Sequence, residues 1–284
     1  MRVTSLARRL GAAALVLTVG AGLTSCSDDS SSTDSSSTAT DEGTDAATDE
    51  GTDESTNEAG TDVAELSADD FYPTVMAAMR EAGTFNFETV SDSAGQSQTM
   101  SGQARFSGAG VEMKASSTGA QPMELILLGE AMYLKSPDMG TGDKWVKIDL
   151  SDPNSLFGMI GKATDPEVMF KAMESPEKLE LIGTEDVDGV STNHYRITMD
   201  PTQYLKAMEF PAAMADMLPK ELTTEMWVDG DNLPRKFAQT LDVPSVGGGA
   251  ASTSTTEGTY SDFGTDVEIE APPADEVTEN FPGA

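Results

Sequence analysis

The chain has 284 residues, with 49 acidic and 17 basic side chains, a formal net charge of −32 at pH 7, one cysteine and one histidine. A surface this negative repels phosphate backbones, so the composition excludes nucleic acid as a partner. One histidine and one cysteine are too few to build a zinc site, and a single cysteine forms no internal disulfide.

The first 25 residues have the order of a secretory signal peptide. Arg2, Arg8 and Arg9 precede an apolar run from Leu10 to Leu23. That run is shorter than the roughly 20 apolar residues that a membrane-spanning helix needs. Cys26 follows at the end of this segment, where a signal peptide is cut.

The residues Leu23-Thr24-Ser25-Cys26 resemble a bacterial lipobox. The resemblance implies that residues 1–25 are removed and that Cys26 becomes the lipidated N-terminus, carrying palmitate-type acyl chains. Two such chains hold a protein stably at a bilayer, since each buried methylene contributes roughly 0.8 kcal/mol. We therefore expect a lipoprotein on the extracytoplasmic face of the cell membrane. The alternative is an ordinary signal peptide followed by a chance cysteine.

Residues 26–62 form an acidic, Ser/Thr-rich tract after Cys26, without a basic or aromatic side chain. Such a segment cannot bury enough surface to offset its ordering entropy. We expect a disordered tether whose 36 residues after the cysteine span roughly 30 to 35 Å. A metal-collecting tail is the alternative, although the carboxylates lack calcium-loop spacing.

Residues 63–273 form one domain, and residues 274–284 are expected to be a frayed tail. The domain opens with an amphipathic helix that Ser67 caps and Gly83 ends. Its apolar positions recur at helical spacing. They are Phe71, Val75, Met76 and Met79.

Antiparallel strands follow, because apolar and polar residues alternate between Gly/Ser turns. The first strand places Phe85, Phe87 and Thr89 on one face. Gly129-Glu130 and Asp188-Gly189 mark hairpin turns. Short Met-rich helices are expected after Asp152-Pro153, Asp165-Pro166 and Asp200-Pro201.

These elements predict an α+β fold. About ten strands form a strongly curved antiparallel sheet, a half-barrel, with short helices covering an apolar concave face.

Three segments resemble the LppX/LprAFG lipoproteins of actinobacteria, which are similar in fold to the carriers LolA and LolB. They are GEAMYLKSPDMGTGDKWVKIDL, GTEDVDGVSTNHYRITMD and TTEMWVDGDNLPRKF. The resemblance implies a lipid-binding domain that carries a lipid or lipoglycan through the cell envelope, without a cofactor and without catalysis. A membrane transporter is a further partner that this role suggests, and a monomer is the expected state. The alternative is a non-catalytic scaffold or envelope-stress sensor that binds another envelope protein.

Large flexible side chains of the helices and first strand are the candidates for the cavity wall, because methionine adapts to varied acyl chains. For any single methionine, core packing is the better explanation, whereas for the set as a whole the half-barrel favours cavity lining. The candidates are Phe71, Val75, Met79, Phe85, Phe87, Leu156, Phe157, Ile160, Met169, Phe170, Met173, Leu205, Met208, Phe210, Met214 and Met217.

Other conspicuous residues favour structural roles. His194 lies in an alternating strand without a nucleophile-elbow motif elsewhere in the chain, which argues against a hydrolase. Trp145 and Trp227 are interpreted as sheet anchors, with sugar stacking as the alternative. Basic side chains at strand ends are either solvated or contacts for an anionic headgroup. These are Lys135, Lys144, Lys147, Arg235 and Lys236.

Overall fold

The computed structural model describes residues 63–93, 95–108, 110–119, 121–151, 176–207, 221–243 and 252–279. Cys26, the tether and the helices expected within 152–175 and 208–220 lie outside these ranges. The described helices are α1 (Ala68–Ala82) and α4 (Pro201–Ala207), with 3-10 turns η1 (Pro137–Met139) and η3 (Ala274–Glu276). The strands are β1 (Thr84–Ser93), β2 (Gln96–Ser107), β3 (Gly110–Gly119), β4 (Met123–Leu128), β5 (Ala131–Lys135), β6 (Trp145–Asp149), β7 (Lys178–Val187), β8 (Val190–Met199), β9 (Leu222–Asp229), β10 (Pro234–Val243), β11 (Ser252–Ser261) and β12 (Val277–Thr278).

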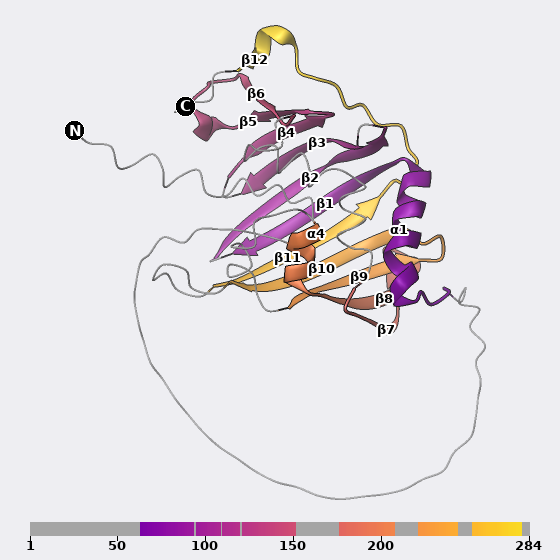
Figure 1. The fold of residues 1–284 in the computed structure, drawn as a ribbon. Helices are drawn as coiled ribbons and strands as arrows, with labels where there is room; N and C mark the ends of the chain where they lie inside the picture. The colour runs from indigo at the N-terminus through magenta and orange to yellow at the C-terminus, as the bar shows by residue number, and fades with distance from the viewer. Residues whose placement is uncertain are drawn as a thin grey trace, which may run out of the picture.

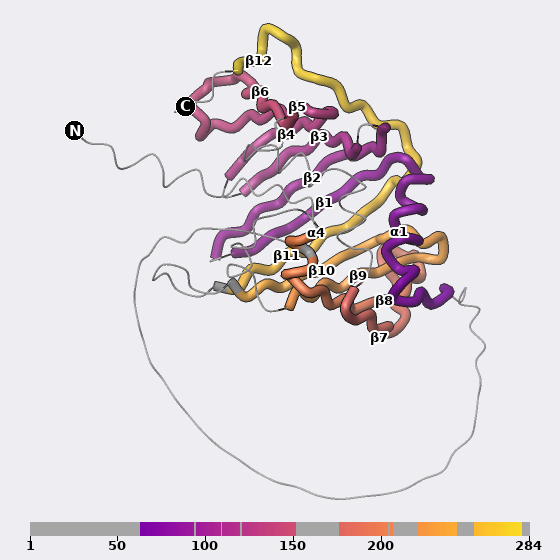
Figure 2. Tube along the Cα trace, in the orientation of Figure 1, coloured from indigo at the N-terminus to yellow at the C-terminus, as the bar shows by residue number. Residues whose placement is uncertain are grey.

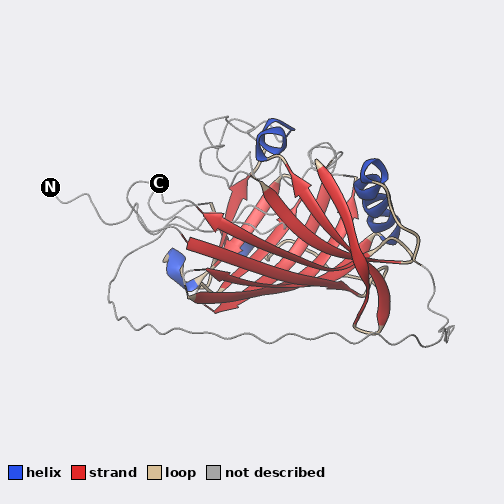
Figure 3. Ribbon diagram, turned by 90° about the horizontal axis from the view of Figure 1, so that it is seen from below, coloured by secondary structure: helices blue, strands red, loops and turns tan. Residues whose placement is uncertain are grey.

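One open sheet contains all of these strands, in the order β12-β6-β5-β4-β3-β2-β1-β11-β10-β9-β8-β7. Each half is a meander of sequence neighbours, β1 to β6 and β7 to β11. The halves join where β1 pairs with β11. The sheet is strongly curved and does not close on itself (Figures 1 and 3). The predicted α+β half-barrel is therefore confirmed, with twelve strands where about ten were expected.

One strand that the sequence patterns did not predict is β12, near the C-terminus. Val277 pairs with Trp145 and Thr278 with Val146, in parallel. Figure 2 follows the yellow segment after β11 to this edge, beside β6. Val267 and Ile269 of that segment pack near Trp145. The frayed tail expected from residue 274 is thus corrected for residues 277 and 278, whose backbone is paired to the sheet edge.

Helix α1 has the predicted ends and the predicted buried stripe. The Ser67 hydroxyl accepts from the Asp70 N–H at 3.3 Å, and the Gly83 N–H donates to the Met79 carbonyl at 3.0 Å. Gly83 has φ of 77°, a conformation that glycine adopts without steric cost. The buried side chains are Phe71, Tyr72, Val75, Met76 and Met79.

Helix α4 begins at the predicted Asp200-Pro201. Asp200 Oδ1 accepts from the Thr202 N–H at 2.8 Å. This backbone hydrogen bond holds the pKa of Asp200 below its ordinary value. Both predicted hairpin turns are present as well, and Asp188 and Gly189 have φ of 51° and 81°. Two consecutive positive φ values give the twist that favours two-residue hairpins.

Candidate functional site

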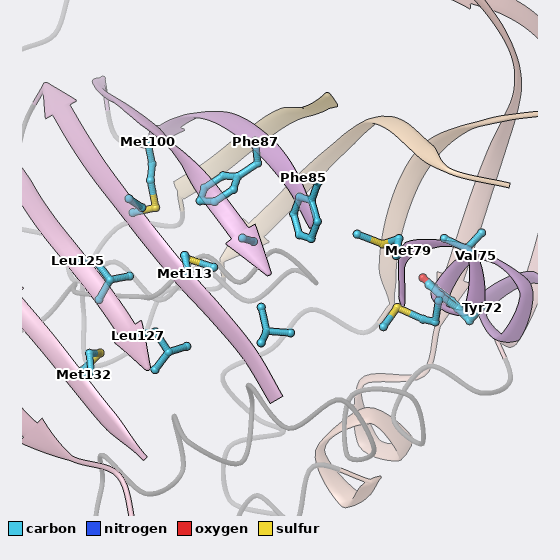
Figure 4. Close-up of a cluster of buried hydrophobic side chains, with 14 of the residues drawn as sticks. Tyr72, Val75, Met79, Phe85, Phe87, Met100, Met113, Leu125, Leu127 and Met132 are labelled. Atoms are coloured by element: carbon cyan, nitrogen blue, oxygen red, sulfur yellow. The ribbon is translucent and has the colours of Figure 1, made fainter. Parts of the chain in front are cut away.

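The concave face of the sheet is an apolar wall at the end where β1 begins. In register across six strands, Phe85, Ala104, Met113, Leu127, Met132 and Ile148 lie side by side. Each is at most 8% exposed. Alternation with a period of two places residues at positions i and i+2 on the same face, so Phe87, Ala115, Leu125 and Leu134 continue this wall. Figure 4 labels Phe85, Phe87, Met113, Leu125, Leu127 and Met132 of this wall, together with Val75 and Met79 of α1.

The other half of the sheet extends the wall. Strands β8, β9 and β10 contribute apolar side chains on the same face. Those that belong to one continuous cluster with the first half are Tyr195, Ile197, Met199, Leu222, Val228 and Leu241. Helix α1 connects the two halves, because Phe71 contacts the Tyr195 ring edge-to-face with centroids 4.9 Å apart and Met79 lies near Phe85 in the same cluster (Figure 4).

Methionine is a large part of this cluster. Its thioether chains are unbranched and polarizable, so they adapt to irregular apolar shapes. They come from the helix and from four different strands, and therefore reach across the whole face. The buried members are Met76, Met79, Met100, Met113, Met132 and Met199.

The structure brings five of the predicted wall residues together in this cluster: Phe71, Val75, Met79, Phe85 and Phe87. Leu205 is buried in α4, at 4% exposed. Ten predicted residues lie outside the described ranges, namely Leu156, Phe157, Ile160, Met169, Phe170, Met173, Met208, Phe210, Met214 and Met217. Sequence reasoning did not select Met100, Met113, Leu125, Leu127 or Met132, although period-two alternation followed through each strand would have found them.

The basic side chains of the strands lie on the opposite, convex face. The strand register places on this convex face every lysine and arginine that has a directly paired residue on a neighbouring strand. They are Arg105, Lys114, Lys135, Lys147, Lys178, Arg196 and Lys236. Several pair locally, such as Arg105 with Glu112 and Arg196 with Glu225 at 2.8 Å. The basic residues considered for an anionic headgroup therefore do not line the apolar wall at Lys135, Lys147 or Lys236.

A second cluster on the convex face surrounds His194. Its ring stacks on Trp227, with centroids 4.0 Å apart and planes 15° apart. Glu185 accepts from Nδ1 of His194 at 3.0 Å and from the indole N–H of Trp227 at 2.9 Å. The Trp227 bond, followed by the His194 bond, lowers the pKa of Glu185 below its ordinary value. These contacts clamp β7 to β8 and β9, which is the structural role predicted for His194.

The two tryptophans are sheet anchors on the convex face. Trp145 is 8% exposed and packs with Ile126 and Ile269. Trp227 is 6% exposed, and the Lys236 ammonium lies 4.9 Å from its ring centroid. Both rings are therefore occupied by the protein's own side chains, as the anchor interpretation expects.

An open groove of about 610 Å³ lies beside Trp227 on this convex side. Carboxylates dominate its lining, with Glu88, Asp92, Glu185 and Glu257 among them, and Lys236 is its one base. Lys236 is 3.7 Å from Glu257 and so is already paired.

Within the described ranges, no three His, Cys, Asp or Glu side chains are grouped to hold a metal ion. Of the helices in the described part of the chain, none is long and apolar enough to cross a membrane.

The site is thus a largely apolar concave face on an open, mainly antiparallel sheet, with α1 across one end. No family model matches the chain. A curated relative is the "Uncharacterized 31.2 kDa protein in rplA-rplJ intergenic region" of Streptomyces griseus, 26% identical over 170 residues, which are 54% of this chain and 52% of the relative. The chain therefore spans about half the length of the curated relative it matches.

Solved structures with a similar arrangement include two mycobacterial proteins. LprF from Mycobacterium bovis is 13% identical, with a TM-score of 0.45, over 72% of this chain and 96% of that chain. The lipoprotein LppX from Mycobacterium tuberculosis is 16% identical, with a TM-score of 0.43, and the match covers 70% of this chain and 99% of LppX. MucB of Pseudomonas aeruginosa, in complex with MucA, is 15% identical, with a TM-score of 0.36, and the match covers 72% of this chain and 61% of that chain. LprF and LppX carry the names of the lipoproteins that the sequence segments resemble.

Proposed function

We propose that this protein binds the acyl chains of an amphiphilic lipid or lipoglycan against its concave face and carries the molecule through the cell envelope. The observation that carries the proposal is the continuous apolar face that both halves of the sheet and α1 share. In this proposal, Cys26 holds the protein at the cell membrane through its acyl groups, and the acidic tract lets the domain move away from the bilayer surface.

Binding of this kind needs no chemistry. Each methylene transferred from water to an apolar wall contributes roughly 0.8 kcal/mol, so one acyl chain of ordinary length supplies enough free energy for stable binding. The charges on the convex face keep the carrier in water while its interior holds the lipid. We therefore assign no catalytic residue, and His194 acts only as a packing residue.

Native mass spectrometry of the Cys26→Ala protein, produced in an actinobacterial host with its signal peptide cleavable, tests the proposal. The substitution removes the anchor lipid, so any adduct is cargo. We expect a reproducible adduct that extracts into organic solvent as a lipid. If the protein has only the mass of the polypeptide, and binds no lipid after incubation with envelope extract, the carrier function would be overturned. That result would favour the scaffold or sensor function.

A pair of alanine substitutions locates the adduct on the concave face. Ala115 lies on the apolar wall, at 6% exposed, whereas Ala238 lies on the convex face of β10. Ala115→Phe fills space on the wall and should lower the lipid-bound fraction. Ala238→Phe adds the same atoms on the other face and should leave that fraction unchanged. Equal effects would place the lipid elsewhere.

A further inference from the structure

A row of five uncharged polar residues crosses the concave face. Gln98 pairs with Ser91, Ser91 with Thr256, Thr256 with Gln239, and Gln239 with Thr224. These residues come from β2, β1, β11, β10 and β9, which are adjacent in the sheet. Because directly paired residues share a face, the five side chains form one continuous strip, here called the polar row.

Side chains of the polar row already make hydrogen bonds to one another. The hydroxyls of Ser91 and Thr256 are 3.2 Å apart, and Nε2 of Gln239 donates to Oγ1 of Thr224 at 3.0 Å. Gln239 is 9% exposed, and the other four are half-buried. Hydroxyl and amide groups donate and accept more than one bond each, so these pairs retain capacity for a ligand.

The polar row lies at the end of the concave face away from the C-terminus of α1. Strand β1 starts directly after Gly83, which ends α1, and runs from Phe85 and Phe87 to Ser91. Beyond the row on β1 and β11, Ser93 pairs with Ser254, whereas β10 and β9 have Leu241 and Leu222 at the corresponding positions. One direction along β1 therefore leads from aromatic and methionine side chains to hydroxyls and amides.

No ionised group belongs to this strip. The lysines and arginines at regularly paired positions of the strands point by register to the convex face, as do Glu88, Asp92 and Glu257, which flank the row in sequence. A phosphate or sulfate placed on the row would find hydrogen-bond donors but no countercharge, and a buried charge without a partner is costly.

We propose that the polar row binds the headgroup of the amphiphile, that this headgroup is uncharged and carries several hydroxyl groups, and that the acyl chains extend from it toward α1. The inference rests on the proposed function, because it assigns an orientation and a headgroup class to the same site. A continuous strip of five polar side chains beside a large apolar cluster is explained by a ligand group that needs hydrogen bonds there.

Three defined probes with identical acyl chains test the headgroup class: a dihexosyl diacylglycerol, phosphatidylglycerol and plain diacylglycerol. Affinity is measured by native mass spectrometry titration of the Cys26→Ala protein. We expect the dihexosyl lipid to bind about tenfold or more tightly than either other probe, as two net hydrogen bonds allow. The double variant Thr224→Val with Gln239→Leu should lose that preference and keep its affinity for diacylglycerol.

The matched control is Thr223→Val with Gln103→Leu. Both residues are half-buried and lie by register on the convex face. This variant should keep the full preference. If all three probes bind with equal affinity, or if phosphatidylglycerol binds most tightly, the inference about the headgroup is overturned but the proposed lipid-carrier function is not. If none of the three probes binds, the proposed lipid-carrier function itself is overturned.

Photolabelling of the same protein tests the orientation without any change to the polar row. A dihexosyl lipid with a diazirine at the end of an acyl chain should label peptides that contain Met113, Leu127 or Met132. The same lipid with the diazirine on its sugar should label peptides of β9 and β10. The reverse pattern, or the same peptides from both probes, would overturn the proposed orientation.

Discussion

The ring of Phe237 lies directly over Gly258 on the neighbouring strand. A Cβ added at Gly258 would meet Cε1 of Phe237 at 2.2 Å and the carbonyl oxygen of Glu88 at 3.0 Å. Phe237 is 3% exposed and its ring centroid is 5.7 Å from that of Tyr260. The ring therefore fills the space that the missing side chain leaves, at the centre of the curved sheet.

We expect Gly258→Ala to lower the free energy of unfolding by about 1 to 3 kcal/mol, the usual effect of overpacking a closely packed site. Urea unfolding followed by tryptophan fluorescence measures the change. Gly183→Ala is the control, since nothing lies within 4 Å of a Cβ at Gly183. Adding Phe237→Leu to Gly258→Ala should recover part of the loss, whereas no recovery would show that the clash is not with the ring.

Asp229 fixes the turn between β9 and β10. Its Oδ1 accepts from the backbone N–H groups of Asp231 and Leu233, each at 2.9 Å, and its Oδ2 accepts from Nε of Arg235 at 2.6 Å. The Asp229 side chain is 3% exposed. Asp229→Ala should therefore cost about 3 kcal/mol of unfolding free energy, because it leaves a partly buried cation and two turn amides without their acceptor.

Asp229→Asn serves as the comparison in the same urea experiment. The amide oxygen still accepts from the two turn N–H groups but carries no charge for Arg235. Its loss of stability should lie between that of the alanine variant and zero. If both variants lose the same amount, the ion pair with Arg235 outweighs the turn hydrogen bonds.

Local patterns in the sequence predicted the strands and their inward faces because those patterns depend on near neighbours alone. The helical spacing of Phe71, Val75 and Met79 and the alternation of Phe85, Phe87 and Thr89 each report one buried side. The dipeptide Asp188-Gly189 likewise predicted a hairpin turn, because Asp and Gly favour the backbone conformation of two-residue turns. These features need no knowledge of the rest of the chain.

Features that depend on distant partners were not predictable in the same way. The pairing of β1 with β11 joins residues about 170 positions apart, and it alone brings Ser91 beside Thr256. The polar row therefore could not be predicted from the sequence. Each of its residues is an ordinary polar residue in a strand, and only the pairing of the strands places the five side by side. Strand β12 was missed because two residues carry no periodic signal, and its partner Trp145 lies more than 130 positions earlier.

Glu185 makes the stability of the convex-face cluster depend on pH. Its pKa in the folded protein lies below the ordinary value of 4.5, because Trp227 and His194 donate to the carboxylate. The unfolded protein therefore takes up this proton first as the pH falls. The stabilisation is complete above the ordinary pKa and is lost as the pH decreases through the lowered one.

The difference in unfolding free energy between the wild-type protein and Glu185→Gln should accordingly be largest near neutral pH and shrink between pH 5 and pH 3. Urea titrations at each pH measure it. Glu88→Gln controls for removal of one negative charge from the same groove. A difference that stays constant with pH would show that the Glu185 contacts act by packing instead of charge.

The entry of the chain into the domain depends on Tyr195. Its hydroxyl accepts from the Leu66 N–H at 2.9 Å, while Nδ2 of Asn193 donates to the carbonyls of Val63 and Ala64 at 3.0 and 3.2 Å. The ring of Tyr195 is 1% exposed and contacts Phe71 of α1. Two neighbouring side chains of β8 therefore bind the segment that links the acidic tract to the first helix.

Tyr195→Phe removes only the hydroxyl and keeps the ring in place. It should cost about 1 to 2 kcal/mol, because the Leu66 N–H loses its acceptor. Hydrogen exchange should show faster exchange in residues 63–66 and unchanged protection in β2 and β3, since the sheet does not depend on this bond. Tyr133→Phe, on the convex face, controls for loss of a phenol. Faster exchange throughout the sheet would mean that the hydroxyl stabilises the whole fold instead of the chain entry, and that α1 cannot loosen independently of the wall it covers.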